Sequence, residues 1–253
     1  MRRLVLLLLL ITLFACETDD RNEVLVLGLI HGKHLTESEF STEVLREMIR
    51  DIDPDIILAE IPPDRFEKAM SSYAETGIVN EYRVAQFPEY VDVIIPLTKE
   101  MDFTLIPTSA WTEEMANDRL TKMRAIRDDP NREYEWQKYG FAKYIADSIK
   151  EASGRQYNPY WINSSAYDDA SEIALRVYNE LFNEELGPGG WDNINKAHYE
   201  NIEKALNEYT NQGKRIVITY GAGHKGWFLR KLHERDDIKL ISLGEAISLD
   251  SQD

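Results

Sequence analysis

The stretch RIVITYGAGHKGWFLRKL, residues 215–232, contains the pattern that decides the fold. Residues 215–220 are mostly apolar and rich in β-branched side chains, as in a strand that is buried on both faces of a sheet. The glycine-rich turn GAGH follows at residues 221–224, and a helical pattern begins at about Lys225. A buried strand that passes directly into a helix is the repeating unit of α/β proteins with parallel sheets.

The same alternation of strands and helices continues on both sides of this stretch. Apolar runs predict further strands at residues 24–30, 55–60, 103–107 and 238–243. Helical spacing of apolar residues predicts helices between them, at residues 41–52, 62–75 and 88–100. We therefore expect an α/β fold with a mixed, mostly parallel central sheet that is flanked by helices.

The middle of the chain has a different pattern. Helical spacing covers residues 111–127, 132–152, 166–186 and 191–210, and no strong strand signal separates these segments. Since no linker divides the chain, we expect residues 24–253 to form a single α/β domain with a large helical insertion at residues 111–186. The tyrosines and tryptophans of the insertion could line a ligand cleft, but we expect them to belong mainly to its core.

The N-terminus has the features of a bacterial lipoprotein signal. Two arginines precede an apolar run, residues 4–14, which is too short to span a bilayer but has the length of a signal-peptide core. The run ends in LFAC, which resembles a lipobox, and its Cys16 is the only cysteine in the chain. We expect a signal peptide over residues 1–15, lipidation of Cys16 and a polar tether over residues 16–23. An ordinary secretory signal with an incidental cysteine is the alternative.

Composition limits the partners of this protein. The formal net charge is −16, and binding to nucleic acid requires a basic surface, so we expect no nucleic-acid partner. A lipid anchor would attach the exported protein to the cell envelope, at the outer membrane or the cell surface, without spanning the membrane. We expect a small-molecule or peptide substrate, and the sequence leaves the oligomeric state open.

Three ionisable side chains lie at the ends of predicted buried strands. His31 and His224 directly follow strands, and Glu60 ends a third. Because the carboxyl ends of parallel strands form the ligand-binding edge of an open sheet, we expect the three side chains to meet there. Two imidazoles and a carboxylate could bind a divalent metal, or they could form a metal-free acid–base set.

Glycines and one further histidine lie beside these residues. Gly28, Gly221 and Gly223 occupy strand ends or strand-to-helix turns, where the backbone needs a positive φ or a close approach. Backbone N–H groups of the GAGH turn would lie at a helix N-terminus, which suits an anion or a developing oxyanion. His34 could join the site, although we expect it to be exposed to solvent. The chain has no GxSxG nucleophile motif.

These motifs resemble the TraB/GumN/Tiki family, which belongs to a superfamily with erythromycin esterase and the haem-binding lipoprotein ChaN. GLIH, residues 28–31, is similar to the G-x-x-H motif of the family, and EIPPDR, residues 60–65, is similar to its glutamate followed by an arginine. GAGH is similar to the histidine motif near the C-terminus of the family. The preceding segment keeps Trp191, Asn195 and Asn201, but Ile194 stands where the family has arginine.

The resemblance implies hydrolysis or haem binding. Tiki-like members imply metal-dependent proteolysis with the G-x-x-H histidine and the glutamate, and members similar to erythromycin esterase imply hydrolysis without a required metal. We therefore expect an exported hydrolase of ester or peptide bonds that uses His31, Glu60 and His224, with Arg65 and Asn195 orienting the substrate or the catalytic groups. A non-catalytic lipoprotein that binds haem or another ligand in the same pocket is the alternative, and an inactive scaffold is a third possibility.

Overall fold

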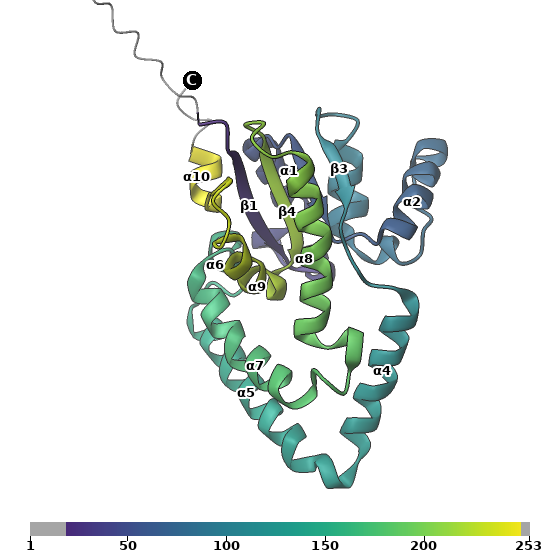
Figure 1. Ribbon diagram of the computed structural model, residues 1–253, viewed down its shortest axis with the longest axis vertical. Coiled ribbons are helices and arrows are strands. Elements are labelled where there is room, and N and C mark those ends of the chain that lie inside the picture. The colour runs from purple at the N-terminus through teal and green to yellow at the C-terminus, as the bar shows by residue number, and fades with distance from the viewer. Residues whose placement is uncertain (1–18, 249–253) are drawn as a thin grey trace, which may run out of the picture.

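A sheet of five parallel strands forms the centre of the computed structural model, which describes residues 19–248 (Figure 1). The strand order is β3-β2-β4-β1-β5, and every neighbouring pair is parallel. The strands are β1 (Asn22–Leu29), β2 (Ile56–Ala59), β3 (Thr104–Pro107), β4 (Arg215–Gly221) and β5 (Ile238–Leu240). The predicted α/β fold is confirmed, and its sheet is entirely parallel.

Strands β1 and β4 are neighbouring interior strands of the sheet, and their apolar side chains contribute to both of its faces. The register pairs Gly28 with Tyr220 and Leu29 with Gly221, so the two strands end side by side. Alternate residues of β1 enter two separate apolar clusters, one on each face, with Leu27 in the first and Val26 in the second. This period of two explains why continuous apolar runs form these strands.

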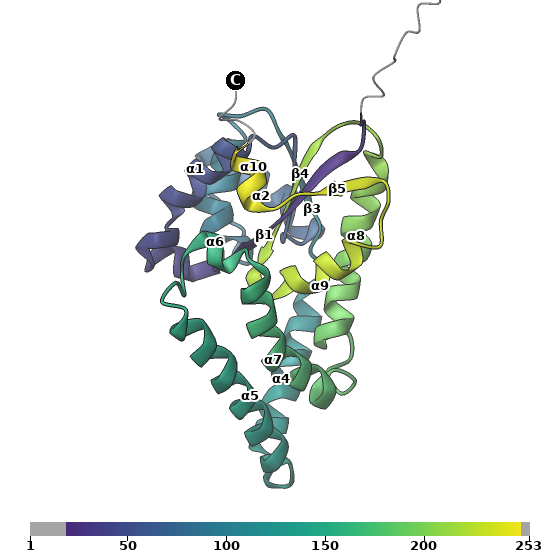
Figure 2. The ribbon, with the colours of Figure 1, turned by 90° about the vertical axis from the view of Figure 1, so that its left-hand side faces the viewer.

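Helices cover the two faces of the sheet (Figures 1 and 2). The first apolar cluster includes side chains of α1 (Thr42–Ile52), α2 (Pro63–Thr76), α3 (Ile95–Leu97) and α10 (Leu243–Ser248). The second includes side chains of α8 (Trp191–Glu208) and α9 (Ala222–Leu232). Short turns complete the connections: η1 (His31–Leu35), η2 (Ser38–Phe40), η3 (Val84–Gln86), the π-helical η4 (Glu89–Ile94), η5 (Pro130–Arg132) and η6 (Gly187–Gly189). The single helix predicted at residues 88–100 is therefore η4 followed by α3.

Most of the helical insertion extends away from the sheet as an arm, but Ile162 belongs to the first apolar cluster of the sheet (Figures 1 and 2). It consists of α4 (Glu113–Asp128), α5 (Glu133–Ala152), α6 (Pro159–Ile162) and α7 (Ser165–Phe182), and α5 packs along α7. Trp136 and Tyr139 pack against a small apolar cluster of the arm, as expected for core aromatics, but Tyr134 and Tyr160 are exposed. Among the residues that the structure describes, no helix is long and apolar enough to cross a membrane.

The predicted signal peptide, residues 1–15, and the lipidation site Cys16 lie outside the described residues. Strand β1 begins at Asn22, two residues before its predicted start, so the end of the expected tether is part of the sheet. Asn22 is buried, and its side-chain amide donates to the carbonyl oxygen of Tyr209 at 2.7 Å. The ordered sheet therefore includes the last two residues of the segment that its polar composition predicts to be a tether.

Candidate active site

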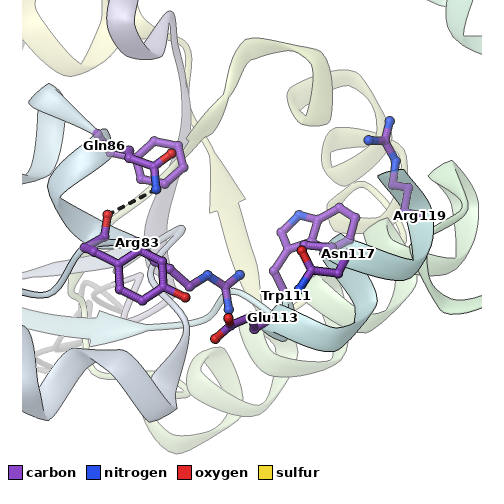
Figure 3. A pocket seen from close by; sticks show the side chains of 9 residues that line it. Arg83, Gln86, Trp111, Glu113, Asn117 and Arg119 are labelled. Atoms are coloured by element: carbon purple, nitrogen blue, oxygen red, sulfur yellow. Dashed lines mark hydrogen bonds between the residues drawn. The ribbon is translucent and has the colours of Figure 1, made fainter. Parts of the chain in front are cut away.

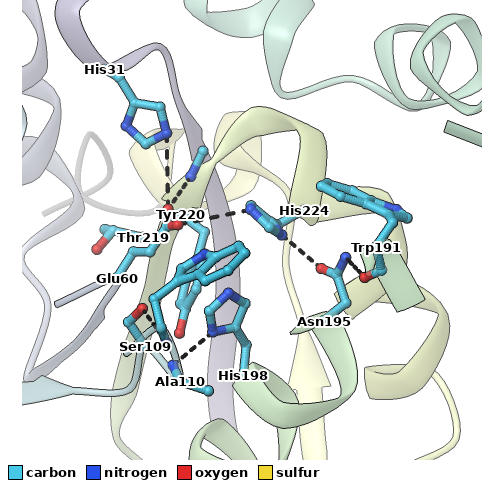
Figure 4. A network of polar contacts seen from close by, with 12 residues as sticks. His31, Glu60, Ser109, Ala110, Trp191, Asn195, His198, Thr219, Tyr220 and His224 are labelled. Atoms are coloured by element: carbon cyan, nitrogen blue, oxygen red, sulfur yellow. Dashed lines mark hydrogen bonds and ion pairs between the residues drawn. The ribbon is translucent and has the colours of Figure 1, made fainter. Parts of the chain in front are cut away.

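The structure brings His31, Glu60 and His224 together at the carboxyl edge of the sheet (Figure 4). His31 follows β1, Glu60 follows β2, and His224 lies in the first turn of α9 after β4. His31 Nε2 lies 4.0 Å from Glu60 Oε2, and His224 Nε2 lies 3.8 Å from Glu60 Oε1. The two imidazoles, which follow the neighbouring strands β1 and β4, therefore both face the carboxylate that follows β2, at distances slightly too long for direct hydrogen bonds.

Glycines allow this approach. A Cβ atom on Gly221 would lie 2.4 Å from His31 Nε2, and a Cβ on Gly28 would lie 3.0 Å from the Cα of Ala222. A Cβ on Gly223 would make only an ordinary contact with Trp191, at 3.4 Å. All three have negative φ, so close approach, and not a positive φ, explains the first two. His31 itself has a φ of 51°, a strained conformation of the kind that concentrates at functional sites.

His31 is held by a buried carboxylate that the sequence analysis missed. Its Nδ1–H donates to Glu89 Oε1 at 2.5 Å, which leaves Nε2 directed at Glu60. Burial on its own lowers the pKa of His31, but the hydrogen bond and the charge of Glu89, with the charge of Glu60, outweigh it and raise the pKa above its usual value. Glu89 is fully buried at the start of η4, in the largely apolar segment EYVDVII, and an acid at a position that such a segment would bury is the signal that could have identified it.

His224 has a defined tautomer. The side-chain amide of Asn195 donates to the carbonyl oxygen of Trp191 at 2.7 Å, so its Oδ1 must accept the hydrogen bond from His224 Nδ1, at 2.7 Å. The lone pair of His224 is therefore on Nε2, facing Glu60. Burial lowers the pKa of His224 well below its usual value, and the ring stacks on Trp191. Asn195 thus orients His224. Both polar atoms of its side chain are engaged in these two hydrogen bonds, so it does not orient the substrate.

His198 is a second residue that the sequence analysis did not assign to the site. It lies on α8, three residues after Asn195 and on the same buried face, which is the signal that could have identified it. Its Nδ1 accepts a hydrogen bond from the backbone N–H of Ala110 at 2.9 Å, so the neutral ring carries its proton on Nε2. Burial lowers the pKa of His198 to about 3. Nε2 is buried and has no hydrogen-bond partner among residues 19–248.

Glu60 is the centre of the cluster. Its carboxylate is buried, and Oε2 accepts a hydrogen bond from the backbone N–H of Gly221 at 2.9 Å. Burial is the main cause that raises its pKa. The backbone of Glu60 is fixed by Tyr90, whose hydroxyl accepts from the Glu60 N–H at 2.8 Å and donates to the carbonyl oxygen of Thr219, also at 2.8 Å. The carboxylate is therefore rigidly placed between two strand ends.

A divalent metal does not fit these donor atoms well. Among the described residues, the group with ligand atoms all within 4.8 Å of one another is Glu60, His198 and His224, and it does not include His31. His198 cannot serve as a neutral ligand there, because Ala110 occupies the lone pair of Nδ1 and Nε2 carries a proton. Only two ligands remain, whereas catalytic zinc sites use three protein ligands.

Two other predicted residues have structural roles. His34 is buried, contrary to the expected exposure, because both ring nitrogens bond the backbone: Nδ1 donates to Phe40 O at 2.6 Å and Nε2 accepts from Ile30 N–H at 3.2 Å. It therefore shapes the turn that carries His31. Arg65 pairs with Glu81 at 3.5 Å and Glu113 at 3.0 Å, which ties α2 to the start of α4.

A cavity of about 500 Å³ opens beside the cluster (Figure 3). The segment at η3 forms one wall and the first turns of α4, with the preceding Trp111, form the other. The ring of Phe87 lies 5.1 Å from that of His31, and the ring of Trp111 lies 6.2 Å from that of His198. Walls of the cavity are thus also walls of the histidine cluster, so a molecule bound there would adjoin the ionisable groups.

No protein-family model, curated protein or solved structure matches this chain. Its chemistry is therefore inferred from the donor and acceptor atoms of the site. His31 can exchange a proton at Nε2, Glu60 and the lone pair of His224 can accept hydrogen bonds, and His198 can donate one. These are the components of acid–base catalysis in a largely buried site.

Proposed function

We propose that this protein is a hydrolase of ester or peptide bonds, of the TraB/GumN/Tiki-like type, that works by acid–base catalysis without a metal. The observation that carries the proposal is the position of His31 between two carboxylates. Glu89 holds Nδ1, and Nε2 faces Glu60. A carboxylate that fixes the tautomer and orientation of a histidine is the arrangement that general-base histidines use.

A water molecule between His31 and Glu60 would be the nucleophile. Because the two facing atoms are 4.0 Å apart, a water could lie about 2.8 Å from both. His31 Nε2 takes a proton as the water oxygen bonds to the substrate carbonyl carbon. The carbon–oxygen or carbon–nitrogen bond then breaks, and His31 returns the proton to the leaving alcohol or amine. The pKa of His31, raised above that of a free imidazole, suits a base that works near neutral pH.

His198 supplies a donor for the tetrahedral intermediate. Its ring is neutral, buried and protonated at Nε2, and that N–H has no partner among the described residues. A neutral imidazole can polarise a carbonyl and stabilise the oxyanion, because it donates without losing its proton. The Nε2 lone pair of His224, which is neutral, would accept a hydrogen bond and help to position the water beside Glu60.

The N-terminal sequence supports export and a lipid anchor. An apolar run followed by a lipobox-like LFAC at Cys16 would attach the enzyme to the cell envelope, at the outer membrane or surface. The non-catalytic alternative, haem binding by the same pocket, has less support, because an axial ligand needs an imidazole nitrogen free to face the iron. Both candidate Nε2 atoms face Glu60 instead.

Hydrolysis of a panel of 4-nitrophenyl esters and short peptides tests the proposal. We expect His31→Gln to lower kcat/KM by about 10²–10⁴-fold, the usual contribution of a general base. His233→Gln is the matched control, because His233 is exposed and its Nδ1 bonds the carbonyl oxygen of Leu229 in its own helix. Equal activity of His31→Gln and the wild type would refute the role of His31. A Soret band on addition of haem that His31→Ala abolishes would support the binding alternative.

A further inference from the structure

The cavity beside the histidine cluster carries two arginines without counter-ions. Arg83 belongs to the wall at η3, and Arg119 to the wall at α4 (Figure 3). Neither guanidinium forms an ion pair with a carboxylate anywhere in residues 19–248, although the chain as a whole has a net charge of −16. Two unpaired cations on opposite walls of one cavity are unexpected in such an acidic protein.

The guanidinium of Arg119 has a neutral partner, and that of Arg83 has a buried nitrogen without one. Arg119 donates from Nη2 to the hydroxyl of Tyr178 at 2.9 Å, and its stem packs where a Cβ on Gly189 would be only 2.9 Å away. Arg83 Nη1 is buried and has no hydrogen-bond partner among the described residues. A buried cationic donor without a partner is costly, and an anionic ligand would satisfy it.

The carboxylate that lines the cavity does not fill this role. Glu113 accepts from Arg65 Nη2 at 3.0 Å, and Arg65 is oriented by Glu81 on its other side, at 3.5 Å. The predicted site residue Arg65 thus pairs with Glu113, which lines the cavity, and with the buried Glu81. Arg83 and Arg119 remain available to a ligand.

Aromatic side chains connect these cations to the catalytic groups. Tyr82, Phe87 and Trp111 line the same cavity, and Phe87 and Trp111 contact His31 and His198 as described above. A ligand with an apolar or aromatic body and an anionic end could therefore lie between the guanidiniums and the imidazoles. A volume of about 500 Å³ lies within the range of small-molecule sites.

We infer that this cavity binds the anionic end, a carboxylate or a phosphate, of a substrate whose apolar or aromatic body leads to the scissile bond. This substrate class rests on the proposed hydrolase function. Planar, bidentate recognition of an oxyanion is the interaction that arginine pairs provide. Neutral esters and amides would lack it.

Calorimetric titration of the full chain with three small probes tests the inference. Phenylacetate and phenyl phosphate carry the two candidate anions, and phenylacetamide is the neutral analogue of the first. We expect one or both anions to bind at least 10-fold more tightly than phenylacetamide, and binding to weaken at high salt. Equal binding of phenylacetate, phenyl phosphate and phenylacetamide would overturn the inference.

Variants assign the binding to this cavity. Arg83→Met and Arg119→Met should each weaken binding of the preferred anion at least 10-fold, and Arg119→Lys should recover part of the loss. The matched control is Arg176→Met, an exposed arginine of α7, which should bind as the wild type does. Unchanged binding in Arg83→Met and Arg119→Met would overturn the inference. Equal melting temperatures, measured by circular dichroism, ensure that folded proteins are compared.

Glu60→Gln separates this inference from the proposed function. It should abolish hydrolysis but keep binding of the anion, because Glu60 does not line the cavity. Anion binding that depends on Arg83, in a protein that hydrolyses no ester or peptide, would refute the proposed function and leave the cavity assignment intact. Hydrolysis that depends on His31 but is equally fast for anionic and neutral esters would refute the assignment of the cavity and support the proposed function.

Discussion

His224 and Lys225 are neighbours in the chain, and their side chains meet very different surroundings. Lys225 is buried, and its Nζ donates to Asp168 Oδ2 at 2.5 Å and to the carbonyl oxygen of Ser164 at 3.3 Å. His224 is fixed by one hydrogen bond from Nδ1, and its Nε2 lies 3.8 Å from Glu60, beyond hydrogen-bond distance. One turn of α9 therefore carries a satisfied ionisable group beside an incompletely satisfied one.

This difference indicates a structural role for Lys225 and a chemical role for His224. Asp168 belongs to α7, so the Lys225–Asp168 pair connects the helical arm to the sheet. Near Glu60, by contrast, the buried Nε2–H of His198 has no hydrogen-bond partner among the described residues, which costs stability. We interpret the first arrangement as a device that holds the fold and the second as one that awaits a substrate.

Removal of the satisfied group should have the largest effect on stability. Lys225→Met leaves the largely buried carboxylate of Asp168 without its partner, which costs about 3–5 kcal/mol of the free energy of unfolding. The double variant Lys225→Met/Asp168→Leu should recover most of this loss. Urea denaturation measures both. A loss below about 0.5 kcal/mol, the level of ordinary surface changes, would show that the pair does not hold the arm.

A side chain added at Gly221, in the turn before His224, should have a smaller effect on stability. Gly221→Ala places a Cβ where His31 Nε2 now lies, so the ring must move. We expect a cost of about 1–3 kcal/mol in stability and a greater proportional loss of kcat/KM, because the displaced His31 no longer faces Glu60. Gly32→Ala, with open space around its Cβ, is the control. Wild-type kcat/KM in Gly221→Ala would show that catalysis does not require His31 to face Glu60 as it does in this structure.

Glu89→Gln should have the subtlest effect, on pH dependence. Glu89 helps to raise the pKa of His31, so the variant should show a lower pKa. His31 must be neutral to act as a base, and the acidic limb of the pH–rate profile should therefore move to lower pH. The stability that the raised pKa contributes is fully present below pH 6.5 and is lost as pH rises through the folded pKa. Unfolding free energies at pH 6 and pH 8 should differ less in the variant.

Sequence patterns predicted the strands and the residues at their ends, because both depend on local chemistry. All five predicted strands exist, and their bounds differ by a few residues at most. His31, Glu60 and His224 meet because parallel strands end at one edge. The mostly parallel sheet that was expected is parallel throughout, because helices connect each strand to the next and bring every strand back in the same direction.

The rest of the site depends on tertiary packing that no local pattern encodes. Glu89 lies in a π-helical turn within an apolar run, and His198 lies on the buried face of α8. His34 was expected in solvent, but two backbone partners hold it in the interior. Arg65 was expected near the substrate, but acidic groups from two other segments bind it. The partners of Glu89, His198 and Arg65 are distant in sequence, whereas His34 is held by backbone groups only four and six residues away.

Hydrolysis by metal-free protein tests the central claim most directly. The protein would be treated with a strong chelator, shown by elemental analysis to contain no stoichiometric metal, and assayed on its best ester or peptide substrate beside His31→Gln. We predict that the treated wild type keeps its full kcat/KM, that added zinc or manganese does not raise it, and that His31→Gln remains at least 100-fold slower. Activity that is lost with the metal and restored by adding it back would contradict the metal-free mechanism.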